Sequence, residues 1–393
     1  MKVALVHDYL REYGGAEMVV EDLHSIFPDA PLYTAYYNPE TLGDHAKRFQ
    51  SWDIRTSFIQ KLPFAGILLS PLRIIAPLAF EKFDLSQFDL VISSCNLYSS
   101  KAVVTNPAAL HLSYIHTPPK MLYGYTTSFN YKKHWWTRLG AEIINHFMRI
   151  TDFQISQRPN ILIANSKNVQ ARIKKFYRRD SVVIYPGVDI NKYQAAEGEP
   201  RQSRVSSIKY QGKKEYFISL GRLVRGKGAE IAVAACTKLN LPLKVVGVGP
   251  ELDNLKKIAG SNIEFTGGVS EDEKIKLLAN AKALIVASEQ EDFGITPIEA
   301  MVAGTPVIAA GSGGYLETVV AGKTGEFFQV SPNLGESKKY VDQTSVYNLM
   351  NVLETFDPKK YHQSELKDQA EHYSKEKFKK EILSLIKQNY HTK

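Results

Sequence analysis

Short apolar runs alternate with amphipathic stretches along most of the chain. In the first half, runs of Val, Ile and Leu predict strands at Lys2–Val6, Pro31–Tyr36, Leu90–Ser93, Ala102–Thr105, Leu112–His116, Ile161–Ala164 and Val182–Ile184. Several of these runs have no polar face, which is typical of strands covered on both sides in a parallel sheet.

The segment 191–214 interrupts this alternation, because it is polar and almost free of aliphatic clusters, and we interpret it as an interdomain linker. The later apolar runs predict strands at Tyr216–Ser219, Leu243–Val246, Ile263–Phe265, Ala283–Val286, Pro306–Ala309 and Gly325–Phe328. Helices are expected between them, for example at Glu251–Ala259, Glu271–Asn280 and Thr296–Ala303. Repeated βα units favour a doubly wound parallel sheet with right-handed crossovers.

These patterns predict an N-terminal Rossmann-like domain over residues 1–190, the linker 191–214, and a C-terminal domain over 215–372. Residues 373–393 predict a last helix. This helix either packs on the C-terminal domain or crosses back to pack on the N-terminal one. Its apolar side carries Phe378, Ile382, Leu383 and Ile386. The expected fold class is therefore α/β, with two doubly wound sheets whose ligand-binding carboxyl edges face a central cleft.

Composition narrows the class of protein. A chain of 393 residues is too long for one ordinary core, and 44% hydrophobic with 23% charged residues is typical of a globular protein. The first apolar run ends at His7, too early for a signal peptide, and no run of about 18 apolar residues predicts a membrane-spanning helix. The two distant cysteines, Cys95 and Cys236, indicate no disulfide framework. We expect a cytoplasmic protein.

The net charge of +8 suits phosphorylated substrates, nucleic acid or an anionic membrane. Nucleic acid is the least favoured partner, because the chain has no zinc-ligand spacing and no RNA-binding aromatic signature. The stretch 57–83 mixes Phe, Leu and Ile with single cations, and residues 131–138 place two tryptophans beside Lys132, Lys133 and Arg138. Both stretches suit peripheral contact with a membrane surface. The alternative is that both are core helices.

Two glycine-rich turns follow predicted strands. The GGAE run with Gly14 and Gly15 opens a helix near Ala16, where free N–H groups could face a phosphate. It is not the dinucleotide fingerprint, and an ordinary turn is the alternative. The run GRLVRGKG at 221–228 carries Arg222 and Lys227, and this combination suits a diphosphate. A solvated basic loop is the alternative there.

Two further motifs carry polar chemistry. In EDFGITPIE, seven residues separate Glu291 from Glu299, and carboxylates accept the paired hydroxyl hydrogens of sugars and ribose. Thr296 is the expected N-cap of the helix, and dipole-favoured acidic residues are the alternative interpretation. His116 ends a predicted strand before Pro118 and therefore points to the cleft, although a lone His is more often structural.

Together these residues resemble the GT-B glycosyltransferases of family four, the large retaining group. The likeness covers nearly all of residues 2–328 and is tightest in the C-terminal half. EDFGITPIE is the most specific mark, and AMVAGTPVIAAGSGGYLETV follows it as in the family. GRLVRGKG, VVGVGPELDNLK, ANSKNVQARIKKFY and YPGVD resemble further family segments, while Arg225 stands where many members have Pro or an acidic residue.

The resemblance implies a role for each candidate residue. Arg222 and Lys227 would hold the donor diphosphate, and Glu299 would bind the ribose hydroxyls. Glu291 and His116 would contact the transferred sugar. The remaining donor-binding positions are backbone positions, namely Gly14, Gly15, Phe293, Gly294, Ile295 and Thr296.

The implied activity is retaining transfer of a hexose to a glycan or polyprenyl-linked acceptor, in polysaccharide or glycoconjugate biosynthesis. The wording of HTPP, EDFGITPIEA and GSGGYLETV is most similar to bacterial and archaeal mannosyltransferases that use GDP-mannose, and a UDP-sugar donor is the alternative. No cofactor is expected. No DxD metal motif stands out, although Mg²⁺ stays open.

Cations at the diphosphate would stabilise the leaving group. No carboxylate pair with hydrolase geometry can be identified from the sequence, so the resemblance implies a front-face reaction in which the donor phosphate takes the acceptor proton. The alternatives are an epimerase, a phosphorylase with a pyridoxal lysine, and a non-catalytic nucleotide- or glycan-binding module. The joint presence of Arg222, Lys227, Glu291 and Glu299 argues against the last.

Overall fold

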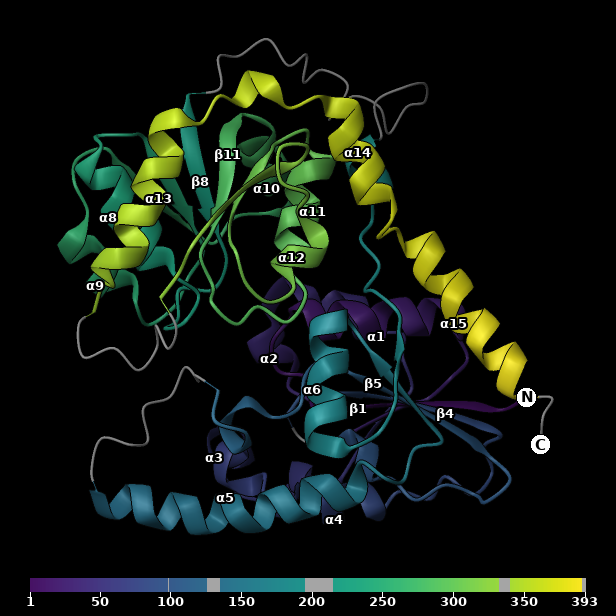
Figure 1. Cartoon of the computed structure of the whole chain (residues 1–393). Coiled ribbons are helices and arrows are strands. Elements are labelled where there is room, and N and C mark those ends of the chain that lie inside the picture. Colours follow the sequence, from purple (N-terminus) through teal and green to yellow (C-terminus); the bar gives the residue numbers. More distant parts are fainter. Residues whose placement is uncertain (98, 126–134, 195–214, 332–339, 391–393) are drawn as a thin grey trace. The chain divides into compact units, whose positions relative to one another are not determined.

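The computed structural model describes residues 1–97, 99–125, 135–194, 215–331 and 340–390 (Figure 1). The chain forms two compact units. Unit 1 contains the described residues of 1–187 and 376–393, and unit 2 contains those of 188–375. Of the segment that the sequence predicts as a linker, α7 (Asn191–Gln194) is described, and residues 195–214 lie outside the described part of the chain.

Unit 1 is built on a parallel sheet of seven strands in the order β3-β2-β1-β4-β5-β6-β7. The strands are β1 (Val3–His7), β2 (Leu32–Thr34), β3 (Ile54–Thr56), β4 (Leu90–Cys95), β5 (Leu110–Ile115), β6 (Ile161–Ala164) and β7 (Val182–Val183). Its α-helices are α1 (Gly15–Ile26), α2 (Pro39–Leu42), α3 (Ala65–Leu72), α4 (Ala76–Glu81), α5 (Trp135–Ile155), α6 (Lys167–Tyr177) and α15 (Lys375–Tyr390).

Two of the hydrophobic clusters of unit 1, one on each face of the sheet, explain the uninterrupted apolar run of β1. Leu5 packs in a core with side chains of α1 and α15, whereas Ala4 and Val6 pack in a second core with side chains of α3 and α4. Because successive side chains of a strand point to opposite faces, burial on both faces requires apolar residues at every position.

The last helix, α15, buries Phe378, Ile382 and Ile386 in the first of these cores. Leu383, expected on the same side, is instead exposed, and Leu385 takes its place in the core. At 100° per residue, position 385 lies closer than 383 to the stripe through 378, 382 and 386.

Unit 2 has a parallel sheet of six strands in the order β10-β9-β8-β11-β12-β13. The strands are β8 (Tyr216–Leu220), β9 (Leu243–Val246), β10 (Ile263–Gly267), β11 (Ala281–Val286), β12 (Val307–Ala310) and β13 (Gly325–Phe328). The helices that follow α7 are α8 (Ala229–Lys238), α9 (Leu252–Ile258), α10 (Glu271–Ala279), α11 (Ile295–Val302), α12 (Tyr315–Thr318), α13 (Gln343–Thr355) and α14 (Gln363–Glu371).

The predicted strand Ala102–Thr105 is wrong. A 3₁₀ turn, η3 (Ser100–Ala102), occupies its start, and it buries Lys101 against Asp152 with an Nζ–Oδ1 distance of 2.6 Å. Ala102 and Val103 of this segment are buried in the core on the connection between the adjacent parallel strands β4 and β5, whereas Val104 is exposed. Strand β3 lies in the polar segment DIRT and was not predicted.

Each sheet reverses its strand order once, between β1 and β4 in unit 1 and between β8 and β11 in unit 2. Loops after the two neighbouring strands diverge at such a point, and the crevice at the carboxyl edge is where open α/β sheets bind ligands. All candidate residues of the sequence lie at or near these two edges.

Candidate functional site

In unit 2, the loop 221–228 leaves the end of β8 and is held against the end of β11. Gly228 has a φ of 77°, and a Cβ there would lie 2.3 Å from the Ala287 carbonyl oxygen. The Ser288 hydroxyl donates to the Gly226 carbonyl at 3.0 Å. Only glycine fits this close approach, so the loop that carries Arg222 and Lys227 is fixed where the strand order reverses.

The structure brings Lys227 and Glu291 together. The Lys227 ammonium lies 2.8 Å from Glu291 Oε2, and the Tyr315 hydroxyl lies 3.4 Å from the same oxygen. Burial, followed by the charge of Glu291, raises the pKa of Tyr315 well above its usual value, so its hydroxyl remains a donor. Arg222 lies on the same loop with its side chain exposed.

The second motif begins α11 differently from the prediction. The N-cap is Gly294, with a φ of 96°, and Thr296 is the second residue of the helix rather than its cap. A Cβ on Gly294 would lie 2.9 Å from Tyr315 Cδ1. The Gly314 N–H donates to the Glu291 carbonyl at 2.9 Å, which ties the backbone beside Phe293 to the next loop.

Glu299 lies in α11 and pairs with a lysine that the sequence did not single out. Lys274, in α10, lies 2.8 Å from Glu299 and 3.0 Å from Glu271, and the Lys274 and Glu299 side chains are only 14% and 10% exposed. Burial alone lowers the pKa of Lys274, but the two carboxylates outweigh it and raise the pKa. Lys274 lies in the polar helical sequence EDEKIK, and its neighbours in the sequence do not distinguish it as a site residue.

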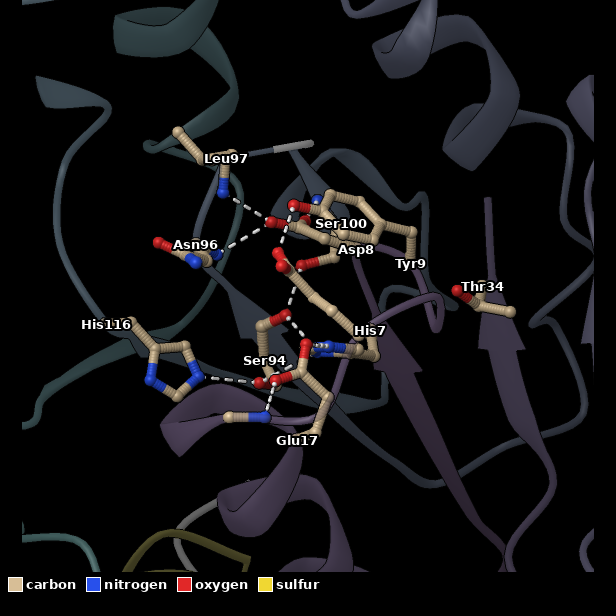
Figure 2. Close-up of polar contacts among 12 residues, drawn as sticks. His7, Asp8, Tyr9, Glu17, Thr34, Ser94, Asn96, Leu97, Ser100 and His116 are labelled. Atoms are coloured by element: carbon tan, nitrogen blue, oxygen red, sulfur yellow. Dashed lines mark hydrogen bonds and ion pairs between the residues drawn. The ribbon is translucent and has the colours of Figure 1, made fainter. Parts of the chain in front are cut away.

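In unit 1, the carboxyl edge carries a buried chain of hydrogen-bonding side chains (Figure 2). Ser94 Oγ lies 2.8 Å from His116 Nε2 and 3.1 Å from His7 Nδ1. His7 and Ser94 are register partners in the neighbouring strands β1 and β4, and His116 follows β5 directly. The exposed fractions of His7 and His116 are 1% and 7%.

The glycine turn of unit 1 joins this chain through Glu17. Helix α1 begins at Gly15 with Gly14 as its N-cap. The Gly14 N–H donates to Glu17 Oε2 at 2.9 Å, and Glu17 Oε1 lies 3.4 Å from His7 Nε2. Gly14 has extended backbone with a φ of −155°, and its ideal Cβ would touch only Glu17 Oε2, at 3.5 Å.

Asp8 fixes the loop after β4. Its buried carboxylate accepts three backbone N–H groups, from Asn96 at 2.7 Å, Leu97 at 2.5 Å and Ser100 at 2.8 Å (Figure 2). Donors of this kind stabilise the charged form of a buried carboxylate. Asp8 is therefore suited to holding the loop in one conformation beside Ser94.

Burial controls the charge at this edge. Burial, together with the neighbouring His7 ring, lowers the pKa of His116 to about 3. The ring is therefore neutral at physiological pH and offers one donor and one acceptor nitrogen. The sequence analysis identified His116 as a site residue but not His7, Glu17 or Ser94. The available signal for His7 and Ser94 was a polar residue at the end of an apolar strand.

Unit 1 also exposes a large apolar surface on α3, α4 and α5, which lie along one side of the unit (Figure 1). More than half of the exposed large apolar side chains of the described chain lie on or beside these helices, namely Phe58, Phe64, Ile67, Leu68, Ile74, Leu78, Ile143, Ile144, Phe147, Ile150 and Phe153. We call this set the apolar face. The stretch 57–83 therefore contributes buried side chains such as Ile59, Leu69 and Phe80 to the core and exposes others on the apolar face, whereas the side chains of 131–138 lie outside the described part of the chain.

A cavity of about 170 Å³ opens within the apolar face, between Ile74 and Pro77 on one side and Ile144 and Phe147 on the other. Its lining includes Arg73 and Leu97, the latter in the loop that Asp8 holds. Residues 131–134 lie outside the described residues, as do the side chains of Trp135, Trp136 and Arg138. Within the described chain, no helix has the length and apolarity needed to cross a bilayer.

The described residues contain no group of three or more His, Cys, Asp or Glu side chains that could hold a metal ion. The edge of unit 2 carries lysine side chains, and the edge of unit 1 carries two buried imidazole rings. Ammonium groups can bind an anion, and imidazole nitrogens can exchange hydrogen bonds with hydroxyl groups.

Comparison with known proteins agrees with this chemistry. Residues 201–345 match the family model described as Glycosyl transferases group 1. The alpha-1,3/1,6-mannosyltransferase ALG2 of Dictyostelium discoideum is 25% identical over 373 residues, covering 83% of this chain and 85% of the relative. The GDP-mannose-dependent alpha-(1-6)-phosphatidylinositol monomannoside mannosyltransferase of Mycobacterium tuberculosis is 35% identical over 161 residues, covering 36% and 40%.

Solved structures resemble the whole chain. The structure of Anabaena Alr3699/HepE in complex with UDP and glucose superposes with a TM-score of 0.66 and 20% identity, covering 98% of this chain and 99% of the other. At this identity the likeness concerns the fold alone, and the fold is that of the GT-B glycosyltransferases, with two parallel-sheet α/β domains.

Proposed function

We propose that this chain, a glycosyltransferase of group 1, transfers mannose from GDP-mannose to a glycan or lipid-linked acceptor and retains the anomeric configuration. The observation that carries the proposal is the charged edge of unit 2. There the pairs Lys227–Glu291 and Lys274–Glu299 place two carboxylates and two ammonium groups on fixed loops and helices. The relatives named as mannosyltransferases support the choice of sugar.

In this proposal Arg222 and Lys227 bind the donor diphosphate, and the backbone N–H groups at the start of α11 face the same charge. Negative charge grows on the diphosphate as the bond to the sugar breaks, and preorganised cations stabilise that charge. Glu299, oriented by Lys274, accepts the ribose hydroxyls. Glu291, oriented by Lys227 and Tyr315, accepts hydroxyls of the sugar.

The reaction breaks the bond between the anomeric carbon and the diphosphate oxygen and forms a bond from that carbon to the acceptor oxygen. The acceptor proton passes to the departing phosphate oxygen, on the same face of the sugar. This route needs no protein base and no resident metal, and we propose that none is used. Full turnover after dialysis against a chelator is the expected result, and recovery only upon added Mg²⁺ would contradict it.

A donor screen tests the proposal. Thermal unfolding and calorimetry with GDP, UDP and ADP, and with their hexose conjugates, are expected to select GDP and GDP-mannose. Selective binding of UDP and a UDP-hexose would establish the alternative donor, which the UDP-bound structural neighbour makes the next candidate. The one-bond ¹³C–¹H coupling at the anomeric carbon, measured by NMR, is expected to indicate the same anomeric configuration in the product as in the donor. An inverted product would overturn retention.

We further propose that the enzyme works in the cytoplasm, with the apolar face of unit 1 resting on the inner surface of a membrane. Exposed apolar side chains on α3 and α5 would enter the boundary between headgroups and acyl chains. The stretch 57–83 carries Lys61, Arg73 and Lys82 against one acidic residue, and this charge suits anionic lipid. A lipid-linked acceptor would meet the protein at this surface.

Co-sedimentation with anionic liposomes tests the membrane contact. Binding is expected at low salt and is expected to weaken as salt rises, because salt screens the attraction. Changing Lys132, Lys133 and Arg138 together to Glu should abolish binding without unfolding. Ile67→Glu should weaken it, since Ile67 is 82% exposed on α3, whereas Val248→Glu on unit 2, at 62% exposed, is the matched control. No binding at low salt would overturn the membrane contact.

A further inference from the structure

The cavity in the apolar face lies between two parts of unit 1. Three of its lining side chains, Ile74, Ile144 and Phe147, are exposed members of the apolar face. Other lining residues belong to the loops that leave the sheet, with Leu97 after β4 and Pro119 after β5. The cavity therefore joins the surface that we propose to meet the membrane to the loops of the carboxyl edge.

These loops also carry the polar side chains of that edge. Leu97 stands three residues after Ser94, and Pro119 stands three residues after His116. Figure 2 shows Leu97 on the loop that Asp8 holds, in the same view as Ser94 and His116. Three extended residues span at most about 11 Å. The head of a ligand whose chain lies in the cavity could therefore reach the carboxyl edge of unit 1.

The lining favours a single apolar chain. Most of its side chains are apolar, and the volume of the cavity is about 170 Å³. An apolar cavity of about 150 Å³ can hold benzene, a ring of six carbons. The cavity therefore has room for one branched isoprene unit, which has five carbons, and a second chain would not fit beside it.

One charged side chain of the lining, Asp152, is already compensated. It is 4% exposed, Lys101 Nζ lies 2.6 Å from its Oδ1, and the Tyr123 hydroxyl donates to its Oδ2 at 2.8 Å. Burial, followed by the charge of Asp152, raises the pKa of Tyr123 above its usual value, so this hydroxyl stays protonated. Asp152 and Lys101 together carry no net charge, so the pair does not repel an anionic ligand as an unpaired carboxylate would.

The other charged side chain of the lining is Arg73, directly after α3. Its Nε donates to the Ser70 carbonyl at 2.9 Å, and its Nη1 lies 2.7 Å from Met121 Sδ. Met121 follows Pro119 in the loop after β5, so the guanidinium is held beside that loop. A guanidinium binds phosphate oxygens through forked, charge-assisted hydrogen bonds. The lining thus combines an apolar cavity for one chain with a cation for a phosphate.

We propose that the cavity binds the first isoprene unit of a polyprenyl phosphate, with the phosphate on Arg73 and the rest of the chain along the apolar face. This inference names the carrier of the acceptor and rests on the function proposed above for the sugar that the carrier bears. The lipid site itself is a property of unit 1 alone.

Calorimetry of the full chain with farnesyl phosphate, below the concentration at which it forms micelles, tests the site. Farnesol, which lacks the phosphate, is expected to bind roughly tenfold more weakly or worse, as for other lost hydrogen bonds to a charged group. Dioctanoyl phosphatidic acid, a phosphate with two acyl chains, should also bind more weakly than farnesyl phosphate. Equal or tighter binding of the two-chain lipid would overturn the polyprenyl assignment.

Two pairs of variants locate the chain and the phosphate. Ile144→Trp should narrow the cavity and lower the affinity for farnesyl phosphate about tenfold, as expected when two CH₂ groups stay unburied. Ile143→Trp is its control, since Ile143 is exposed on the same helix and lies outside the lining. Arg73→Gln should lower the affinity for farnesyl phosphate and leave that for farnesol unchanged, whereas Lys61→Gln, at an exposed cation outside the lining, should change neither. Equal affinities within either pair would overturn the corresponding contact.

Methionine methyl groups labelled with ¹³C locate the probe without any substitution. Met121 and Met148 line the cavity, whereas Met301 and Met350 lie in unit 2. The NMR signals of the first two are expected to shift when farnesyl phosphate is added, and those of the last two are expected to stay. Unchanged signals of Met121 and Met148 at saturating probe would overturn the site.

The lipid site, the membrane contact and the proposed function fail separately. Ile67→Glu should weaken binding to liposomes and leave the affinity for farnesyl phosphate unchanged, since Ile67 lies outside the lining. Binding of farnesyl phosphate by a protein that binds no nucleotide sugar would overturn the proposed function and leave the lipid site in place. Binding of a nucleotide sugar without binding of farnesyl phosphate would overturn the lipid site alone.

Discussion

The two sheets reverse their strand order in the same way, yet they carry opposite chemistry at that point. In unit 1 the edge holds two imidazoles and a hydroxyl, all buried, beside Glu17 in the first turn of a helix. In unit 2 the edge holds two lysine–glutamate pairs, and the Lys227 side chain is 40% exposed. One topology thus presents a buried hydrogen-bonded network in unit 1 and two lysine–glutamate ion pairs in unit 2.

This difference has a physical consequence. Buried charges are costly unless they are paired or hydrogen-bonded, and at the edge of unit 1 the Asp8 and Glu17 carboxylates accept backbone N–H groups. The other groups there, Ser94 and the two imidazole rings, can both donate and accept, as sugar hydroxyls do, so this edge suits a sugar. A diphosphate carries fixed negative charge and requires cations, which remain solvated until the ligand arrives. The comparison predicts which substitutions act on charge and which act on geometry.

The largest expected effect is a loss of turnover when a cation at the edge of unit 2, which we call the ionic edge, is removed. Lys227→Ala and Arg222→Ala should each lower turnover by roughly 10²-fold or more, because each cation meets charge that grows in the transition state. Single-turnover kinetics with saturating donor measure the chemical step. Lys244→Ala is the matched control, since it breaks an ion pair of 2.9 Å in β9, away from both loops.

If both variants keep near-wild-type turnover, the ionic edge does not serve the leaving group. If only Lys227→Ala keeps it, Lys227 would serve to orient Glu291, its partner in the structure.

The two carboxylates of unit 2 should separate in calorimetry. Glu299→Ala is expected to weaken binding of the bare nucleotide by about tenfold or more, as for other hydrogen bonds to a charged group. Glu291→Ala should spare the nucleotide and weaken binding of the nucleotide sugar. Glu271→Ala is the control for Lys274, because it removes that lysine's other carboxylate partner. Equal loss of nucleotide affinity in both glutamate variants would contradict this division.

The charged site residues of unit 2 were easier to predict from the sequence than the hydrogen-bonded site residues of unit 1. Arg222, Lys227, Glu291 and Glu299 stand within two short motifs, so their spacing alone suggests their chemistry. His7 and Ser94 are 87 positions apart and meet only because β1 and β4 are neighbours in the sheet. Lys274 likewise meets Glu299 through the packing of α10 near α11. Contacts made by topology leave no local pattern.

The strands were predictable because burial on both faces writes continuous apolar runs, as in Ile161–Ala164 and Leu243–Val246, where prediction and structure agree. The same signal misled at Ala102–Thr105, since Ala102 and Val103 are buried in the core although the connection between β4 and β5 forms no strand there. Strand β3, at the edge of its sheet, is mostly exposed and has no apolar run to mark it.

As the pH falls, unit 1 is expected to lose stability before unit 2. Burial lowers the pKa of His116 and of His111 to about 3, from an unfolded value near 6.5. Between these values the unfolded chain binds protons that the folded chain does not, so stability rises with pH and is lost as pH falls below 6.5. The slope is about 1.4 kcal/mol per pH unit for each ring.

Hydrogen exchange, corrected for intrinsic rates, can separate the two units. Amides of β1 and β4 should lose protection between pH 6.5 and 5, before those of β8 and β11, since His111 and His116 both belong to unit 1. His116→Gln should reduce the slope for unit 1 by about 1.4 kcal/mol per pH unit. An unchanged slope would mean that His116 is not held neutral by burial.

The smallest expected effect on folding separates the two glycine turns. Gly14 has extended backbone, and its Cβ would meet only Glu17 Oε2 at an ordinary 3.5 Å, so Gly14→Ala should change the free energy of unfolding by a few tenths of a kcal/mol. Gly228→Ala would instead drive a Cβ into the Ala287 carbonyl at 2.3 Å and should destabilise unit 2 severely.

Because folding does not require glycine at 14, a loss of activity in Gly14→Ala would result from contact between the new methyl group and the ligand. We expect a loss of turnover of roughly tenfold, as for a ligand displaced by the size of a methyl group. Wild-type turnover in a stable Gly14→Ala protein would mean that the ligand does not approach this turn. His116 would then be the remaining candidate in unit 1 for contact with the sugar.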